Sequence, residues 1–187
     1  MALHPSVPVR LGASRRAMLF AATLSMALAL LLMAFALPAQ AQPVPKEHTK
    51  LDITLTAAAD VNPDDQKRAA PILVRVYELK SGNTFENADY FSLHNNDKTL
   101  LGDDLLVRDE FILRPGDVRT IDRRSYPDAT AIGVLAGYRD LPNANWRFVH
   151  KLPPAPEASW WRAAIPANKA KLNIRLEAQG IRLAPIE

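Results

Sequence analysis

The sequence predicts an all-β protein, a β-sandwich of about seven to eight short strands with a small helical insertion. Short segments in which apolar and polar residues alternate, separated by turn residues, recur along most of the chain after residue 50. Between residues 81 and 93 the apolar residues instead recur at near-helical spacing. No internal repeat interrupts the strand pattern. These observations favour two packed sheets over a helical or α/β domain.

The first two predicted strands enclose a long polar loop. Residues 50–57 alternate between apolar and polar side chains, which is typical of a half-buried strand. Residues 72–79 form the second strand, with three β-branched residues on one face. The intervening residues 58–70 contain no run of large apolar residues and include the turn signal Asn62-Pro63. We therefore expect residues 58–70 to form an exposed loop.

The helical insertion follows the second strand. Its apolar positions within residues 81–93 are Phe85, Ala88, Phe91 and Leu93. Ser81 or Asn83 is the expected helix cap, because both side chains can accept a hydrogen bond from a free backbone amide. Residues 98–106 form a further short apolar piece, and the pattern leaves its conformation open.

Six further strands complete the predicted sandwich. Residues 114–117 read Arg-Pro-Gly-Asp and form a turn, because proline fixes one central position and glycine tolerates the next. The strand after this turn is polar and is expected at an edge, whereas residues 130–138 are apolar on both faces and are expected at the centre. The six predicted strands span residues 107–113, 118–122, 130–138, 146–150, 160–165 and 171–178.

The first 41 residues read as an export signal. Residues 1–16 contain three arginines and no acid, and residues 17–37 carry no charge. Pro38 and the small residues of Ala39-Gln40-Ala41 follow, as in a signal-peptidase site. We predict a Sec-type signal over residues 1–41, a tether over residues 42–50 and a β-sandwich domain over residues 51–187. This places the mature protein in the periplasm.

An uncleaved membrane anchor is the alternative to cleavage. The 21 residues of segment 17–37 reach roughly 30 Å as a helix, which matches one bilayer core. This reading allows inner-membrane association through residues 17–37. Ser14-Arg15-Arg16 also resembles a twin-arginine signal, but the strong apolarity that follows it favours the Sec route. Both routes lead out of a bacterial cytoplasm.

Charge and cysteine content exclude several classes of protein. Three of the 23 basic residues and none of the 20 acidic residues lie in segment 1–41, so the rest of the chain is neutral. The composition therefore gives no support for nucleic-acid binding. The absence of cysteine excludes a disulfide scaffold, a thiolate zinc site and a cysteine nucleophile.

Catalytic and metal-binding patterns are also lacking. No serine lies in a Gly-x-Ser-x-Gly sequence, and the scattered glycines form no phosphate-binding loop. Asp89, His94 and Asp97 are the residues best placed to converge on a metal, but a solvated turn after a helix is the interpretation we favour. We predict no enzyme activity, no catalytic residue, no cofactor and no metal.

A second function remains open beside a role in protein interaction. Trp146, Trp160 and Trp161 lie close together in the sequence, and a cavity beside them would suit a periplasmic carrier of a small apolar ligand. A hydrolase or metal enzyme is the third and least favoured class.

An ordered set of short motifs resembles the type VI secretion lipoprotein family called TssJ. The match covers residues 50–178 and consists of Asn62-Pro63, Pro71-Ile72-Leu73-Val74-Arg75-Val76-Tyr77-Glu78-Leu79, Phe85-x-x-Ala88-Asp89-Tyr90-Phe91-x-Leu93, Thr99-Leu100-Leu101-Gly102-x-Asp104, Arg114-Pro115-Gly116, Ala131-Ile132-Gly133-Val134 and Trp146-Arg147.

This resemblance implies a transthyretin-like sandwich in the membrane complex of a contractile secretion apparatus. It also implies two kinds of partner, the periplasmic domain of the inner-membrane protein TssM and other type VI membrane-complex proteins. In the family, the loop between the first two strands takes part in the TssM contact. The corresponding candidate residues are Ala59, Asp60, Val61, Asn62, Pro63, Asp64, Asp65 and Gln66. A passive connector is the alternative reading of this loop.

One departure from the family concerns membrane attachment. The family carries a lipobox with an acylated cysteine as the first mature residue, whereas this sequence has no cysteine. Outer-membrane anchoring by a lipid would thus need an accessory lipoprotein. Otherwise the protein is held by its partners or tethered through residues 17–37.

Overall fold

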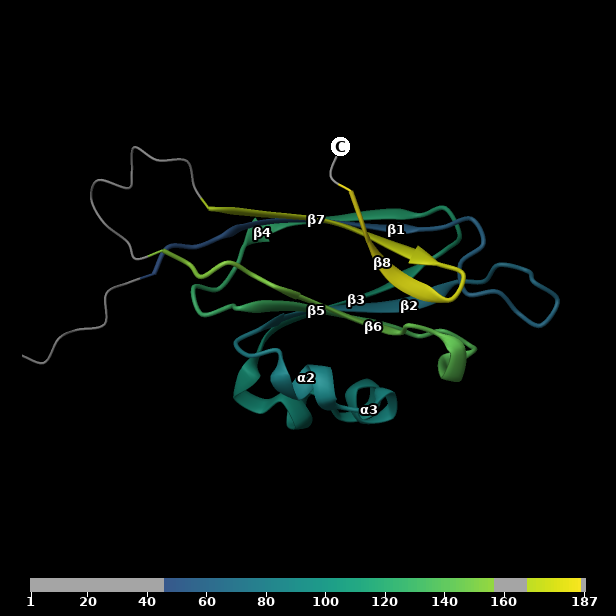
Figure 1. Ribbon diagram of the computed structural model, residues 1–187, viewed down its shortest axis with the longest axis horizontal. Helices are drawn as coiled ribbons and strands as arrows, with labels where there is room; N and C mark the ends of the chain where they lie inside the picture. Colours follow the sequence, from purple (N-terminus) through teal and green to yellow (C-terminus); the bar gives the residue numbers. More distant parts are fainter. Residues whose placement is uncertain (1–45, 157–167, 186–187) are drawn as a thin grey trace, which may run out of the picture. The chain divides into compact units, whose positions relative to one another are not determined.

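The computed structural model describes residues 46–156 and 168–185, which form a two-layer β-sandwich with helices on one outer face (Figure 1). One sheet has the order β4-β1-β7-β8, with β4 (Val118–Arg124), β1 (Lys50–Ala57), β7 (Lys169–Glu177) and β8 (Gly180–Ala184). The other has the order β3-β2-β5-β6, with β3 (Leu105–Leu113), β2 (Ile72–Leu79), β5 (Ala131–Ala136) and β6 (Arg147–Lys151). The prediction of a β-sandwich with a small helical insertion is confirmed.

Strand positions in the sheets agree with the sequence pattern. β5 lies inside its sheet, and the polar β4 lies at an edge. β1 and β7 pair in parallel, and the other neighbouring strands pair antiparallel. β8 was not predicted, because its five residues are too few to establish a period. The predicted strand at residues 160–165, with Trp160 and Trp161, lies outside the described residues.

The main core lies between the two sheets. Leu51, Ile53 and Leu55 of β1 are fully buried, as their alternation predicted. Val74 and Val76 face them from β2 and are also fully buried. This burial of β-branched and leucine side chains is the main source of stability of the sandwich.

The helical insertion covers the outer face of the β3-β2-β5-β6 sheet, on the side away from the other sheet (Figure 1). It consists of α2 (Asn83–Asn87), α3 (Tyr90–Leu101) and a short 3₁₀ turn, η1 (Gly102–Asp104). Phe85 and Leu93 enter a second core with Tyr77, Leu79 and Leu135 of the sheet. This second core explains why β5 is apolar on both faces.

Two details of the insertion differ from the sequence prediction. The predicted single helix is two helices. Gly82 is at the N-cap of α2, where the Ser81 hydroxyl accepts a hydrogen bond from the Asn83 amide at 3.4 Å, and α3 is capped by Asp89, whose carboxylate accepts from the Ser92 amide at 2.9 Å. Phe91 is 64% exposed, because α3 starts only at Tyr90 and turns this side chain away from the sheet. Residues 98–106, whose conformation the sequence pattern does not decide, form the end of α3, η1 and the start of β3.

A buried charge cluster fastens α3 to the sheet. Asp97 of α3 accepts hydrogen bonds from Tyr77 at 3.0 Å and from Arg108 at 3.0 and 3.2 Å. Arg75 donates to the His94 carbonyl at 2.7 Å and to Glu110 at 2.6 Å. Burial alone would raise the pKa of Asp97, but the hydrogen bonds from Arg108 and Tyr77 outweigh it and hold this pKa below 3.8.

The lowered pKa of Asp97 predicts acid-sensitive stability. Its ionised form is stabilised in the folded state, so this stabilisation is present above the ordinary pKa of 3.8 and is lost as the pH falls through the lower folded pKa. We expect the urea midpoint to fall as the pH drops below about 4. The variant Asp97→Asn should have a lower midpoint at pH 7 and a shallower pH dependence. An unchanged pH slope in this variant would contradict the assignment.

The chain enters the sandwich at the end opposite the loop between β1 and β2 (Figure 1). Near the entry, the Lys50 amide donates to the Asn168 carbonyl at 2.7 Å, and β1 then runs to Ala57. Eight strand residues span about 26 Å. Across the two described ranges, no helix has the length and apolarity needed to cross a bilayer. The predicted signal over residues 1–41 lies outside those ranges.

Candidate functional site

The loop at residues 58–70 is stabilised by a buried side chain and by its own backbone hydrogen bonds. Val61 has no exposed surface and packs into the main core. Its amide donates to the Ala58 carbonyl at 3.1 Å, and its carbonyl accepts from the Ala70 amide at 3.1 Å. The base of the loop is therefore closed by backbone hydrogen bonds and sealed by an apolar side chain.

Asn62 connects this loop to two other segments. Its side-chain Nδ2 donates to the Pro71 carbonyl at 2.9 Å, and its Oδ1 accepts from the Arg139 amide at 2.9 Å. The residue is 4% exposed and has a φ of 50°, a left-handed conformation that asparagine tolerates better than most residues. Asn62 thus fixes the loop against the start of β2 and against the connection between β5 and β6.

Asp64 organises the tip of the loop. Its Oδ1 accepts hydrogen bonds from the Gln66 and Arg68 amides, both at 2.9 Å, and its Oδ2 accepts from Arg68 Nε at 2.7 Å. The side-chain hydrogen bond from Arg68 is the main reason that the pKa of Asp64 is lowered. Lys67 takes a φ of 61° where the chain reverses. The loop is therefore held in one shape by its own side chains.

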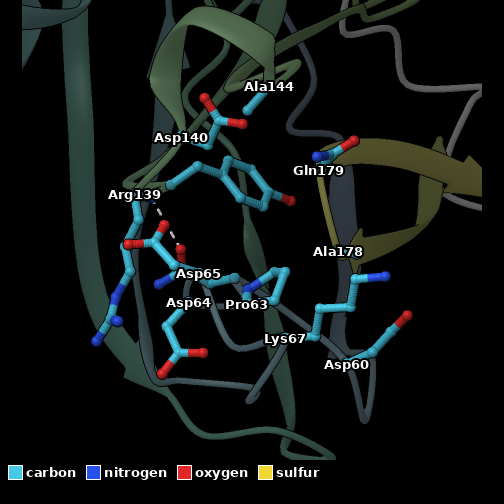
Figure 2. Close-up of a pocket in the computed structure, with 12 residues that line it drawn as sticks. Asp60, Pro63, Asp64, Asp65, Lys67, Arg139, Asp140, Ala144, Ala178 and Gln179 are labelled. Atoms are coloured by element: carbon cyan, nitrogen blue, oxygen red, sulfur yellow. Dashed lines mark hydrogen bonds between the residues drawn. The ribbon is translucent and has the colours of Figure 1, made fainter.

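Three segments surround an open hollow of about 900 Å³ beside this loop (Figure 2). The loop contributes one wall, the connection between β5 and β6 contributes a second, and the β7–β8 turn contributes the third. The second connection contains the 3₁₀ turn η2 (Leu141–Asn143). The side chains that line the hollow are Asp60, Asn62, Pro63, Asp64, Asp65, Lys67, Tyr138, Arg139, Asp140, Ala144, Ala178 and Gln179.

The walls of the hollow are hydrogen-bonded to one another. Asn62 joins the loop to Arg139, as described above. Asn145 joins the second wall to the third, because its amide donates to the Gln179 carbonyl at 2.9 Å and its carbonyl accepts from the Ile181 amide at 3.1 Å. The hollow is thus a preformed feature that binding need not assemble.

Tyr138 lies in the wall of the hollow and is 4% exposed. Its hydroxyl donates no hydrogen bond to any residue that the structure describes. Burial raises the pKa of Tyr138, the charge of Glu177 raises it further, and the Gly180 amide lowers it by less. The phenol is therefore protonated at neutral pH and keeps an unused donor.

The eight sequence-predicted loop residues divide into two groups. Ala59, Asp60, Asp65 and Gln66 are exposed and free to meet a partner, whereas Pro63 and Asp64 are half-buried. Val61 and Asn62 are buried and hold the loop in place. Partner binding through these residues stays a prediction, and the structure assigns different tasks to different members of the set.

Sequence reasoning missed the other two walls. Tyr138 and Arg139 lie in the connection after β5, which ends at Ala136, and Ala178 and Gln179 lie in a turn before the unpredicted β8. No local signal marks these residues, because only the strand order brings them beside the loop. An unpaired polar atom such as the Tyr138 hydroxyl is visible only in three dimensions.

The three residues that the sequence places nearest to a metal-binding pattern have other roles in the structure. Asp89 caps α3, Asp97 is paired with two arginines, and His94 stacks on Tyr90 with 5.4 Å between ring centroids. Within the part of the chain that the structure describes, no group of three histidine, aspartate or glutamate side chains is arranged to hold a metal ion. Trp146 is not among the residues that line the hollow.

Comparison with known proteins places this geometry among secretion-system components. Residues 49–179 match the profile of the family described as "Type VI secretion lipoprotein, VasD, EvfM, TssJ, VC_A0113". The crystal structure of the type VI lipoprotein TssJ1 from Pseudomonas aeruginosa is 38% identical, with a TM-score of 0.64 over 76% of this chain and 100% of that chain. Lip from Serratia marcescens, a membrane-bound component of the type VI secretion system, is 30% identical, with a TM-score of 0.65 over 75% of this chain and 99% of that chain.

A more distant structural match shares the fold alone. It is a chain in the structure described as the TssM C-terminal domain from EAEC, which is 22% identical, with a TM-score of 0.53 over 73% of this chain and 98% of that chain. No curated protein sequence matches the chain.

Proposed function

Because the chain belongs to the type VI secretion lipoprotein family that includes TssJ, we propose that it is a non-catalytic structural component of the secretion membrane complex that docks the periplasmic domain of TssM. The preformed loop at residues 58–70 is the observation that carries this proposal. Its buried residues hold the backbone, and its exposed residues project from one end of the sandwich. A loop that is already ordered loses little conformational entropy when a partner binds.

The position of the loop suits a bridging role in the envelope. The described chain starts at one end of the sandwich, and the loop lies at the other end of β1 (Figure 1). A tether before Lys46 therefore leaves the loop facing away from its point of attachment. We propose export by the N-terminal signal to the periplasm, with attachment through partners or residues 17–37, since the sequence has no cysteine to acylate.

Reversing two exposed charges of the loop tests the docking site. Asp60 and Asp65 are exposed, and no hydrogen bond or ion pair of either side chain is present in the described part of the structure. We expect the double variant Asp60→Lys, Asp65→Lys to bind the purified periplasmic domain of TssM at least about tenfold more weakly, which corresponds to about 1.4 kcal/mol. Isothermal titration calorimetry at fixed salt measures this change.

A matched variant controls for total charge. Glu86 of α2 and Asp103 of η1 are also exposed, and they lie on the helical face away from the loop. The double variant Glu86→Lys, Asp103→Lys carries the same charge change and should bind like the parent protein. Equal affinity of both double variants and the parent would overturn the assignment of the loop. Deletion of residues 60–66 is a poorer test, because it also removes the buried Val61 and Asn62.

A further inference from the structure

The Tyr138 hydroxyl is a buried donor without an acceptor among the described residues. Most buried polar side chains in folded proteins are hydrogen-bonded, and an exception calls for an explanation. Tyr77 provides the contrast within this molecule, because its hydroxyl is also buried but donates to Asp97 at 3.0 Å. Tyr138 lines the hollow that adjoins the proposed docking loop, and its hydroxyl is covered in the free protein.

The charges of the hollow restrict what can pair with this donor. Four carboxylates line it, from Asp60, Asp64, Asp65 and Asp140, against the cations of Lys67 and Arg139 and of Arg68, which pairs with Asp64 at 2.7 Å. This excess of negative charge disfavours a carboxylate ligand. The remaining strong acceptors in a protein partner are uncharged amide oxygens, on the main chain or on asparagine and glutamine side chains. The volume of about 900 Å³ lies within the range of pockets that enclose a small ligand.

We propose that Tyr138 is an anchor of the docking site, and that its hydroxyl donates a hydrogen bond to an uncharged amide oxygen of the partner when the partner fills the hollow. This inference rests on the proposed function, because it takes the TssM domain as the partner. Gln179 is exposed and lines the same hollow. The cost of leaving a hydroxyl unpaired in the free protein is then recovered in the complex.

The variant Tyr138→Phe removes this one hydroxyl and keeps the ring that fills the wall. We expect the dissociation constant for the TssM domain to rise about five- to tenfold, as for the loss of one hydrogen bond. We expect the melting temperature of the free protein to stay the same or to rise, because no internal hydrogen bond is lost. Calorimetric titration and thermal unfolding on the same preparation measure both quantities.

The variant Tyr77→Phe is the matched control. It should lower the melting temperature, because Asp97 loses a buried donor, and it should leave the affinity for the TssM domain unchanged. A loss of affinity only in Tyr138→Phe, together with a lower melting temperature only in Tyr77→Phe, supports the role of Tyr138 as an anchor.

Two results would contradict the role of Tyr138 but leave the proposed docking loop in place. One is an unchanged affinity of Tyr138→Phe while the loop variant Asp60→Lys, Asp65→Lys binds weakly. The other is a clear fall in the melting temperature of Tyr138→Phe, which would mean that the hydroxyl is paired within the protein. If neither Tyr138→Phe nor the loop variant changes the affinity, the proposed docking end itself is wrong.

Discussion

Replacing Asn62 by alanine is expected to lower the free energy of unfolding by about 3 kcal/mol and to weaken TssM binding together with it. The alanine variant loses the hydrogen bonds to the Pro71 carbonyl and from the Arg139 amide. It must also take up a φ of 50°, a left-handed conformation that costs a residue with a Cβ atom about 1–2 kcal/mol. Urea denaturation and calorimetric titration of the same variant measure the two effects.

Two further variants separate the causes. Asn62→Gly tolerates the positive φ and loses only the hydrogen bonds, so it should cost about 1 kcal/mol less than Asn62→Ala. Asn62→Asp keeps an oxygen that can accept from the Arg139 amide, but it replaces the donor to Pro71 by a carboxylate oxygen and brings a charge into a buried position. If all three variants unfold and bind like the parent protein, Asn62 does not hold the loop.

The different roles of the residues in this loop show which of its features can be predicted from the sequence. The alternation of residues 50–57 and the turn signal Asn62-Pro63 place the loop correctly between two strands. The sequence does not reveal that Asn62 is turned inward, because its partners lie at Pro71 and Arg139, nine and 77 positions away. Local pattern therefore predicts where a loop lies, and long-range contacts decide which of its residues are exposed.

The two faces of β2 give a second example. Alternation of Val74 and Val76 predicts one buried face, but nearly every residue of this strand is buried. The opposite face, with Arg75 and Tyr77, is covered by the helical insertion. Charged residues in a strand ordinarily indicate a solvent-facing side, so burial of Arg75 and Glu78 was not predictable from composition. Their burial depends on partners from β3, β4 and α3.

Glu78 forms an ion pair that links the two sheets. It has no exposed surface, and its Oε1 accepts from Arg123 Nε at 2.6 Å. Arg123 belongs to β4 of the opposite sheet, where it pairs in register with the inward-facing Leu51, so its side chain also points into the sandwich. Its Nη1 reaches Asp109 of β3 at 2.7 Å, and the Tyr126 amide donates to Glu78 at 3.2 Å.

The variant Arg123→Ala is expected to destabilise the protein by about 3–5 kcal/mol, because it leaves the Glu78 charge buried without its cation. The pair itself is worth much less than this loss suggests, since burying two charges has a desolvation cost that offsets most of their attraction. The double variant Glu78→Leu, Arg123→Met should therefore recover most of the lost stability. Urea denaturation of the parent, the single variants Glu78→Leu and Arg123→Met and the double variant gives the coupling free energy between the two residues. A double variant as unstable as Arg123→Ala would contradict this account, because the stability lost in Arg123→Ala would then not come from leaving the Glu78 charge unpaired.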